Sequence, residues 1–224
     1  MELGRSIAVV TGGASGLGEA TARHFARSGA QVAVLDRDID RARSVAEEIG
    51  GIACETDVTD ETSVQNAIDT TVKAFGTITA AVNCAGIAEA AKTVGRDGPH
   101  PLPAFQRAID INLVGTFNVA RLAAAAMQHN TPAQDGARGV IINTASIAAF
   151  DGQKGQTAYA ASKGGVVGLC LPMARDLEST VIRVMTIAHG ILMTPILAGL
   201  GEDMQAQLAA VVPCPPRLGD ADEY

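Results

Sequence analysis

Thr11-Gly-Gly-Ala-Ser-Gly-Leu-Gly18 stands between a short apolar run, Ile7–Val10, and a segment with the residue pattern of a helix, Gly16–Ser28. A glycine-rich segment alone is a weak signal, because many such segments are only turns. Its position between a predicted strand and a predicted helix is typical of a dinucleotide-binding turn. The helix N-terminus then presents free amides and a partial positive charge to phosphate groups.

Three glycines of this turn have separate physical roles. Gly12 permits the tight turn, and Gly16 lets the backbone approach a pyrophosphate. Gly18 lets the helix pack closely against the strand. We therefore expect Gly12, Gly16 and Gly18 to contact the cofactor.

The turn opens a regular alternation of apolar runs and helix patterns. Five further β-branched runs follow, at Val32–Leu35, Ile52–Cys54, Ile78–Asn83, Val140–Thr144 and Ile182–Ile187. Helix patterns lie between them, at Asp38–Ile49, Asp60–Phe75, Phe105–Met127 and Ala158–Leu177. This alternation predicts a Rossmann-type α/β fold, a doubly wound parallel sheet of six strands. Ala88–Pro103 and His129–Gly139 are rich in turn residues and are interpreted as surface loops, so that residues 1–224 form one domain.

Composition narrows the class of protein. The 224 residues have a formal charge of −7 and are 47% hydrophobic, which argues against a nucleic acid partner. The four cysteines (Cys54, Cys84, Cys170 and Cys214) are scattered, so we interpret them as buried thiols and predict no metal site. No apolar run has the length of a membrane span or the pattern of a signal peptide, which predicts a cytoplasmic protein.

The end of the second predicted strand indicates which dinucleotide binds. Asp36 follows Gly18 at the usual distance for a carboxylate that accepts hydrogen bonds from the adenosine ribose hydroxyls. Such a carboxylate repels a 2′-phosphate, which favours NAD over NADP. Arg37 follows at once and could pair with a 2′-phosphate, and Asp36 could instead serve only to start the next helix.

Tyr159-Ala-Ala-Ser-Lys163 carries the strongest chemical signal. Four-residue spacing on a helix places the Tyr159 hydroxyl and the Lys163 ammonium on one face. A nearby ammonium favours the phenolate, so we expect it to lower the pKa of Tyr159 and make that residue the proton-transfer group. The alternative is a surface pair with no chemical role.

Two further residues are placed to serve the same chemistry. Ser146 ends the fifth predicted strand, where its hydroxyl can donate to a carbonyl oxygen together with Tyr159. Asn112 falls inside a predicted helix, where asparagine is a mediocre helix former. Asn112 is therefore either exposed or part of a local distortion that serves a proton path.

Together these residues resemble the short-chain dehydrogenase/reductase family over nearly the whole chain. The resemblance rests, in chain order, on Thr11–Gly18, Asp36, Asp57-Val58, Asn83–Gly86, Asn112, Ser146 and the Tyr159/Lys163 pair. Within the family, Gly139–Leu177, Val184–Pro195, Arg217–Asp220 and the Ala88–Pro103 loop are most similar to the type-2 3-hydroxyacyl-CoA dehydrogenases.

The resemblance implies a role for each site residue. Tyr159 would be the acid/base, Ser146 would orient the substrate, Lys163 would hold the nicotinamide ribose, and Asn112 would anchor a water. NAD would contact Gly12, Ser15, Gly16, Leu17, Gly18, Asp36, Asp57, Val58, Cys84, Ala85, Gly86, Tyr159, Lys163, Leu192 and Thr194. Gln153 and Gln156 would lie near the acyl group or its thioester, beside Ser146 and Tyr159.

The chain departs from the family pattern in three places. His189-Gly190 replaces the usual Pro-Gly after the sixth strand, and Glu178–Val181 lacks the proline and glycine usual in that turn. Relatives also continue past Tyr224 for about one helix and a seventh strand. The sixth strand is then expected to be an open edge. The resemblance implies a homotetramer to which the seventh strand normally contributes, so we expect the shorter chain to affect that assembly.

These observations predict an NAD-dependent enzyme that interconverts a secondary alcohol and a ketone. A short-chain 3-hydroxyacyl-CoA is the expected substrate, and Lys92, Arg96 and Lys154 are candidate contacts for CoA phosphates. The alternatives are a hydroxysteroid or other alcohol as the substrate, or a weakened dinucleotide-binding scaffold without turnover.

Overall fold

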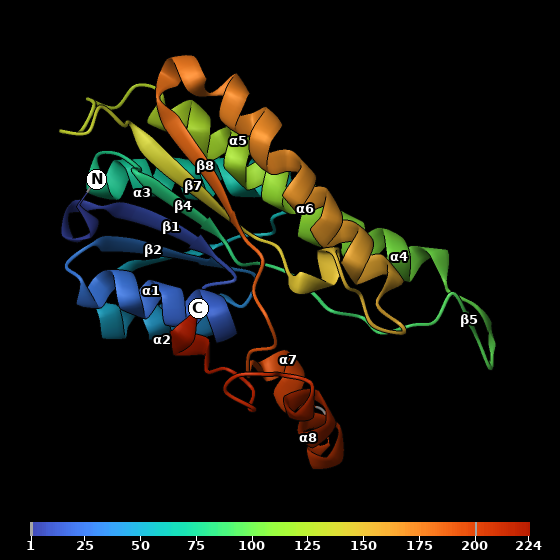
Figure 1. The fold of residues 1–224 in the computed structure, drawn as a ribbon. Helices are drawn as coiled ribbons and strands as arrows, with labels where there is room; N and C mark the ends of the chain where they lie inside the picture. Colours follow the sequence, from blue (N-terminus) through green and yellow to red (C-terminus); the bar gives the residue numbers. More distant parts are fainter. Residues whose placement is uncertain (1, 200) are drawn as a thin grey trace.

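Six parallel strands form one twisted sheet in the order β3-β2-β1-β4-β7-β8 (Figure 1). The computed structural model describes residues 2–199 and 201–224. The strands are β1 (Ile7–Thr11), β2 (Gln31–Asp36), β3 (Ile52–Glu55), β4 (Ala80–Asn83), β7 (Gly139–Thr144) and β8 (Ile182–Ile187). The predicted fold class is confirmed, because each apolar run forms a strand. Most side chains of the central strands are buried, as in a parallel sheet covered on both faces.

Helices cover both faces of the sheet. α1 (Gly16–Arg27) and α2 (Ile39–Ile49) lie below the sheet in Figure 1, and α5 (Gly115–Met127) and α6 (Thr157–Asp176) lie above it. α3 (Glu61–Phe75) packs on the same side as α5, because residues of both join one buried apolar cluster. Residues of α1 and α2 form a second cluster against the opposite face.

Local chemistry determines where the predicted helices begin and end. The carboxylates of Asp38 and Asp60 accept hydrogen bonds from the amides of Arg41 and Ser63, at 3.1 and 2.9 Å. These two aspartates are therefore N-caps outside α2 and α3, and each helix begins one residue later than predicted. Both helices end at a glycine in the left-handed conformation.

The helix predicted over Phe105–Met127 is divided into three segments. α4 (Leu102–Ile109) begins earlier, and a π-helical turn, η2 (Asp110–Val114), separates it from α5. The prediction of one continuous helix is therefore wrong at η2. The predicted strand Ile78–Asn83 is also shorter, because it begins at Ala80.

The predicted loop Ala88–Pro103 contains a small hairpin. β5 (Val94–Gly95) and β6 (Gly98–Pro99) pair antiparallel and project beyond α4 (Figure 1). Short 3-10 turns occur at η1 (Leu3–Arg5), η3 (Ile147–Ala149) and η4 (Glu178–Thr180). Among the free cysteines, Cys54 is buried, Cys84 and Cys170 are half-buried and Cys214 is exposed, which corrects the prediction that all four are buried.

After β8 the chain leaves the sheet and later returns to it. α7 (Pro195–Ala198) and α8 (Glu202–Ala210) project below the sheet in Figure 1. The following segment returns to α1 as a 3-10 turn, η5 (Ala221–Glu223). As predicted, β8 is an edge strand of the described sheet. Its side chains Met185 and Ile187 are exposed.

Candidate active site

A cavity of about 380 Å³ lies at the carboxyl ends of the parallel strands, where ligands bind in open α/β sheets. The glycine-rich turn, the ends of β2, β3 and β4, the start of α6 and the segment after β8 all line it. It contains every cofactor-contacting residue predicted above: Gly12, Ser15, Gly16, Leu17, Gly18, Asp36, Asp57, Val58, Cys84, Ala85, Gly86, Tyr159, Lys163, Leu192 and Thr194.

The glycine-rich turn leaves space that side chains would fill. Gly12 and Gly16 have φ angles of +64° and +53°, which disfavour other residues. A Cβ atom on Gly18 would lie 2.2 Å from the Gly12 carbonyl oxygen, so only glycine permits this approach of helix and strand. A Cβ atom on Gly16 would approach Pro195 Cδ to 3.3 Å. The turn therefore fits a pyrophosphate laid against bare backbone.

Asp36 is oriented at the end of β2 by two backbone amides. Its two carboxylate oxygens accept hydrogen bonds from Ala14 N and Asp38 N, at 3.1 and 3.0 Å. Each oxygen retains a lone pair that can accept from a ribose hydroxyl. The Arg37 side chain forms an ion pair with Asp57, with Arg37 Nε 3.6 Å from the Asp57 carboxylate. A hydrogen bond from Thr59, more than Arg37, lowers the pKa of Asp57.

Lys163 is buried at the other end of the cavity. Its Nζ donates to the carbonyl oxygen of Thr144 at 2.6 Å and lies 5.7 Å from the centre of the Tyr159 ring. The prediction that Tyr159 and Lys163 share one helix face is confirmed. Burial lowers the pKa of Lys163 from 10.5 to about 8, because a charged ammonium is costly away from water.

The pKa of Tyr159 moves in the direction opposite to the one predicted. Burial raises the pKa of Tyr159, and a hydrogen bond with Ser146 only partly opposes that rise. The Lys163 ammonium is directed at Thr144 rather than at the phenol oxygen, and its own pKa is low. The expectation that Lys163 lowers the pKa of Tyr159 is therefore wrong for the protein without cofactor.

Asn112 is fully buried in the π-helical turn η2. Its Oδ1 accepts from Ile87 N at 2.8 Å, and its Nδ2 donates to Ile87 O and to Ser162 Oγ, at 2.9 and 3.0 Å. The alternative of an exposed Asn112 is wrong, and the alternative of a local distortion is confirmed. A π-turn at such a position is typical of functional sites. Asn112 lies behind the lining, close to Gly86 and to the α6 residue Ser162.

Ser146 and the two glutamines complete the predicted set. Ser146 and Gln156 line the cavity, and Ser146 is buried with its Oγ accepting from Ala148 N at 3.2 Å. Gln153 is exposed and is not among the lining residues. Its backbone N–H donates to the side-chain oxygen of Gln156 at 2.9 Å. The structure therefore places Gln153 beside the site rather than in it.

The lining also includes residues that the sequence analysis did not select. They are Thr56, Ile87, Ala88, Ile111, Thr144, Ile191, Pro195 and Leu197. Thr144 ends β7, two residues before Ser146. Its place so near a selected residue is the sequence signal that could have identified it. His189 and Gly190, noted as a departure from the family pattern, line the cavity as well.

His189 is partly withdrawn from water. Burial lowers the pKa of His189, and its Nδ1 lies 2.7 Å from the Gly190 carbonyl oxygen. A neutral imidazole therefore donates this proton to the backbone. The ring stands edge-on to Tyr224, with 5.9 Å between ring centroids and 86° between planes.

A parallel sheet, a glycine-rich turn, a half-buried Tyr159 and a buried Lys163 in one cavity define a nucleotide-dependent oxidoreductase. The family described as short chain dehydrogenase matches residues 6–205, and the chain belongs to that family. Membership implies a nicotinamide dinucleotide as cofactor. Among the described residues, no helix is both long and apolar enough to cross a membrane.

Known relatives cover nearly the whole chain. It is 52% identical over 222 residues to the 3-hydroxyacyl-CoA dehydrogenase type-2 of Homo sapiens, which covers 97% of this chain and 85% of that protein. The protein of the same name from Drosophila melanogaster is 51% identical over 98% of this chain and 88% of its own length. A crystal structure of 3-hydroxyacyl-CoA dehydrogenase type-2 from Mycobacterium avium has a TM-score of 0.91 and 45% identity, over 97% of this chain and 85% of that one.

Proposed function

We propose that the protein is an NAD-dependent dehydrogenase that interconverts a short-chain 3-hydroxyacyl-CoA and its 3-oxo form. The observation that carries the proposal is one cavity that runs from Asp36, past the glycine-rich turn, to Ser146, Tyr159 and Lys163. The substrate class is supported by the names of relatives about half identical to this chain.

NAD is favoured over NADP by the arrangement at Asp36. The carboxylate is held by two amides at the cavity wall, and Arg37, the nearest cation in sequence, is paired with Asp57. A 2′-phosphate would therefore meet negative charge without a free cation beside it. When bound, the nicotinamide supplies the acceptor for the hydride that leaves the carbinol carbon.

The residues at the other end of the cavity handle the proton. We assign Tyr159 as the acid/base, because its half-buried phenol lines the cavity together with Ser146. Ser146 would share the substrate oxygen with Tyr159, and Lys163 would hold the nicotinamide ribose. Asn112 would support a proton path, because it fixes the π-turn beside Gly86. Since the pKa of Tyr159 is raised, alcohol oxidation should be favoured at alkaline pH.

Two of the candidate contacts for CoA phosphates, Lys92 and Lys154, lie on segments whose backbones meet. Ala91 N donates to Gly155 O at 2.9 Å, which joins the segments that carry Lys92 and Lys154. Both lysines therefore extend from adjacent backbone at the side of the cavity that Gln156 lines. Two lysines on adjoining segments would suit an anionic substrate such as an acyl-CoA.

Turnover on matched substrates tests the proposal. NAD reduction would be measured on 3-hydroxybutyryl-CoA, on free 3-hydroxybutyrate and on a panel of hydroxysteroids. We expect a kcat/KM for the CoA ester at least about tenfold above the others, which corresponds to about 1.4 kcal/mol of transition-state binding. Preference for a steroid would replace the substrate class, and NADH binding without turnover would favour a scaffold role.

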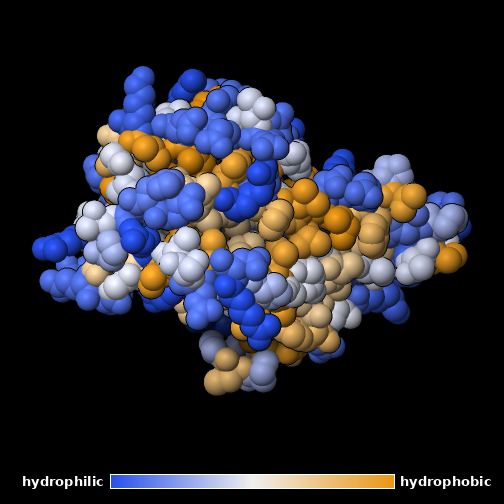
Figure 2. All heavy atoms as spheres, turned by 90° about the horizontal axis from the view of Figure 1, so that it is seen from above, coloured by the Kyte–Doolittle hydropathy of each residue, from blue (hydrophilic) through white to orange (hydrophobic). Residues whose placement is uncertain are grey.

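We also propose that the protein is a homo-oligomer. The face formed by α5 and α6 carries a broad area of hydrophobic residues (Figure 2). Phe117 on α5 is 46% exposed and Leu171 on α6 is 64% exposed. Large apolar side chains gathered on one face are typical of a protein–protein contact.

A further inference from the structure

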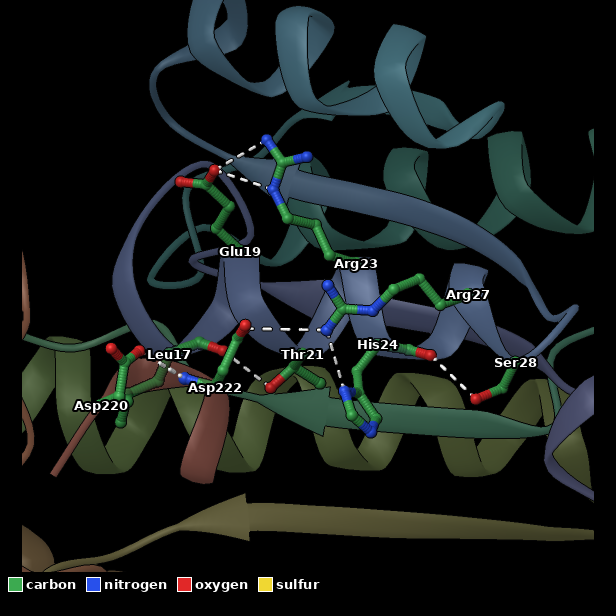
Figure 3. Close-up of polar contacts among 9 residues, drawn as sticks. All are labelled: Leu17, Glu19, Thr21, Arg23, His24, Arg27, Ser28, Asp220 and Asp222. Carbon is green, nitrogen blue, oxygen red and sulfur yellow. Dashed lines mark hydrogen bonds and ion pairs between the residues drawn. The ribbon is translucent and has the colours of Figure 1, made fainter.

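The C-terminal turn reaches the back of the active site. η5 packs against α1, where the Asp222 carboxylate lies 3.8 Å from the Arg27 guanidinium (Figure 3). The same guanidinium contacts His24 Nδ1 at 3.0 Å. Asp220 caps η5 through the amide of Asp222 at 3.1 Å. This turn fixes the position of the residue that follows it, Tyr224.

A second set of contacts ties the same segment to the cavity wall. Gly219 pairs with Leu192 in a β-bridge, and Met193 N donates to Gly219 O at 2.7 Å. Arg217 forms a two-point ion pair with Glu223, at 2.7 and 2.8 Å. Because Leu192 lines the cavity, the segment before Tyr224 is held from both sides.

The Tyr224 hydroxyl makes a short contact with Thr144. The Tyr224 and Thr144 hydroxyl oxygens lie 2.6 Å apart. Either hydroxyl can donate in this contact, and the Thr144 hydroxyl also lies 3.7 Å from Cys84 Sγ. Burial raises the pKa of Tyr224, which keeps the phenol protonated.

Thr144 in turn supplies the acceptor for Lys163. β4 ends at Asn83, opposite Asn143, so the Thr144 carbonyl lies one residue past the β4–β7 ladder. The Lys163 ammonium donates to that carbonyl at 2.6 Å. The amide on the other side of the same peptide, Ala145 N, donates to Ile187 O at 2.8 Å. The orientation of this peptide therefore determines where the ammonium is held.

We propose that Tyr224 is a positioning residue for Lys163: its hydroxyl fixes the Thr144 side chain and thereby the carbonyl that holds the ammonium. The chain of contacts runs from Tyr224 through Thr144 to Lys163. It rests on the proposed function only in that Lys163 is assigned to the cofactor ribose.

The charge of Lys163 depends on few neighbours. Tyr159 lies on its own helix, Cys84 follows β4, His189 follows β8, and Tyr224 is in the C-terminal segment. None of these groups is a carboxylate. The oriented Thr144 carbonyl is therefore a main stabiliser of the ammonium form, and its displacement would favour the neutral amine.

The pKa of Lys163 in the protein without cofactor measures directly how well the Thr144 carbonyl stabilises the ammonium form. The chain has four lysines, Lys73, Lys92, Lys154 and Lys163, so nuclear magnetic resonance of labelled lysine side chains gives a short, assignable spectrum. Tyr224→Phe keeps the ring against His189 and removes only the hydroxyl. We expect the pKa of Lys163 to fall by about 0.5 or more in this variant. The dissociation constant for NADH should rise about threefold at about pH 9, above the pKa of Lys163, and change little at neutral pH, where the ammonium form predominates in both proteins.

Asp222→Asn is the matched control, because it weakens the Arg27 contact of the same turn and leaves the hydroxyl in place. An exposed ion pair contributes little, so the control should match the wild-type pKa and NADH affinity. Thr144→Val should reproduce the effect of Tyr224→Phe, and the double variant should add nothing further.

An unchanged pKa of Lys163 in Tyr224→Phe would overturn the proposal. So would an equal change in Asp222→Asn, since that would indicate only a loosened turn. The result is independent of the substrate: a protein that fails to oxidise 3-hydroxybutyryl-CoA would refute the proposed function and leave this titration intact.

Discussion

Asp36 carries the choice between the two nicotinamide dinucleotides. Its carboxylate accepts from Ala14 N and Asp38 N, which fixes both oxygens at the cavity wall. A single negative charge in that position can favour ribose hydroxyls and oppose a phosphate. Asp36 is therefore the residue at which a substitution can change cofactor specificity with little change in the structure of the site.

Asp36→Asn should weaken NAD binding about tenfold, because the lost charge-assisted hydrogen bonds are worth about 1.5 kcal/mol or more. NADP binding should strengthen at the same time, so the NAD/NADP affinity ratio falls. Glu55→Gln, at the paired position on β3, is the control and should leave the ratio unchanged. A ratio that stays constant in Asp36→Asn would refute the assignment. Calorimetric titration with both dinucleotides gives the values.

Lys163 makes stability depend on alkaline pH. Its folded pKa of about 8 lies below the ordinary 10.5, so between these values the unfolded chain holds a proton that the folded chain has released. The free energy of unfolding therefore rises with pH in that window, by up to about 1.4 kcal/mol per pH unit. Below pH 8 both states are protonated, and this group adds no slope.

Lys163→Met should lack this rise. Urea unfolding of both proteins across the window from pH 8 to 10.5 measures the difference in slope. Every other ionisable group is common to the two chains, so their contributions cancel. Parallel curves for wild type and variant would show that Lys163 is not a buried, weakly basic amine.

The turn between α6 and β8 contains a backbone conformation that its sequence does not suit. Val181 has a φ of +55°, in the left-handed region, and its side chain is 46% exposed. A β-branched residue there is strained. Glu178–Val181 lacks the proline and glycine usual in that turn, and the strain at Val181 is the structural consequence.

Val181→Gly should raise the free energy of unfolding by about 1 kcal/mol, because relief of left-handed strain exceeds the loss of a half-exposed side chain. Thr180→Gly, one residue earlier, should lower stability, because its hydroxyl donates to Leu177 O at 2.8 Å. Denaturant unfolding compares the three proteins. Destabilisation by both glycines would contradict the strain at Val181.

The helices and strands that follow from local pattern were predictable, and those that follow from distant contacts were not. β-branched runs and helix patterns predicted the sheet, α2 and α3 within a few residues. The break in the α4–α5 helix was only one of two alternatives at Asn112, because the contact that decides between them is with Ile87, which lies 25 residues away in sequence. The raised pKa of Tyr159 likewise depends on burial, which residue spacing does not show.

At the level of the assembly, the apolar face of α5 and α6 is the feature without a partner in the single chain (Figure 2). Leu171 is 64% exposed on this face. This exposure could not be predicted from residue order, because it depends on how α6 lies against the sheet. The homo-oligomer expected from family resemblance therefore has a candidate surface.

Leu171→Lys should shift the protein to a smaller species, because a charge buried in an apolar contact is costly. Val94→Lys is the control: Val94 is 72% exposed on the projecting β5 hairpin, away from this face. Light scattering after size-exclusion chromatography gives the masses. An unchanged mass in Leu171→Lys would place the interface elsewhere.

The most direct test of the account is the turnover of Tyr159→Phe beside the wild type. The variant keeps the half-buried ring beside Lys163 and removes the hydroxyl assigned to exchange the proton. NAD reduction on 3-hydroxybutyryl-CoA should fall at least about 100-fold in kcat, while NADH affinity stays within about twofold. Turnover at the wild-type rate by Tyr159→Phe would contradict the assignment of Tyr159 as the proton-transfer residue.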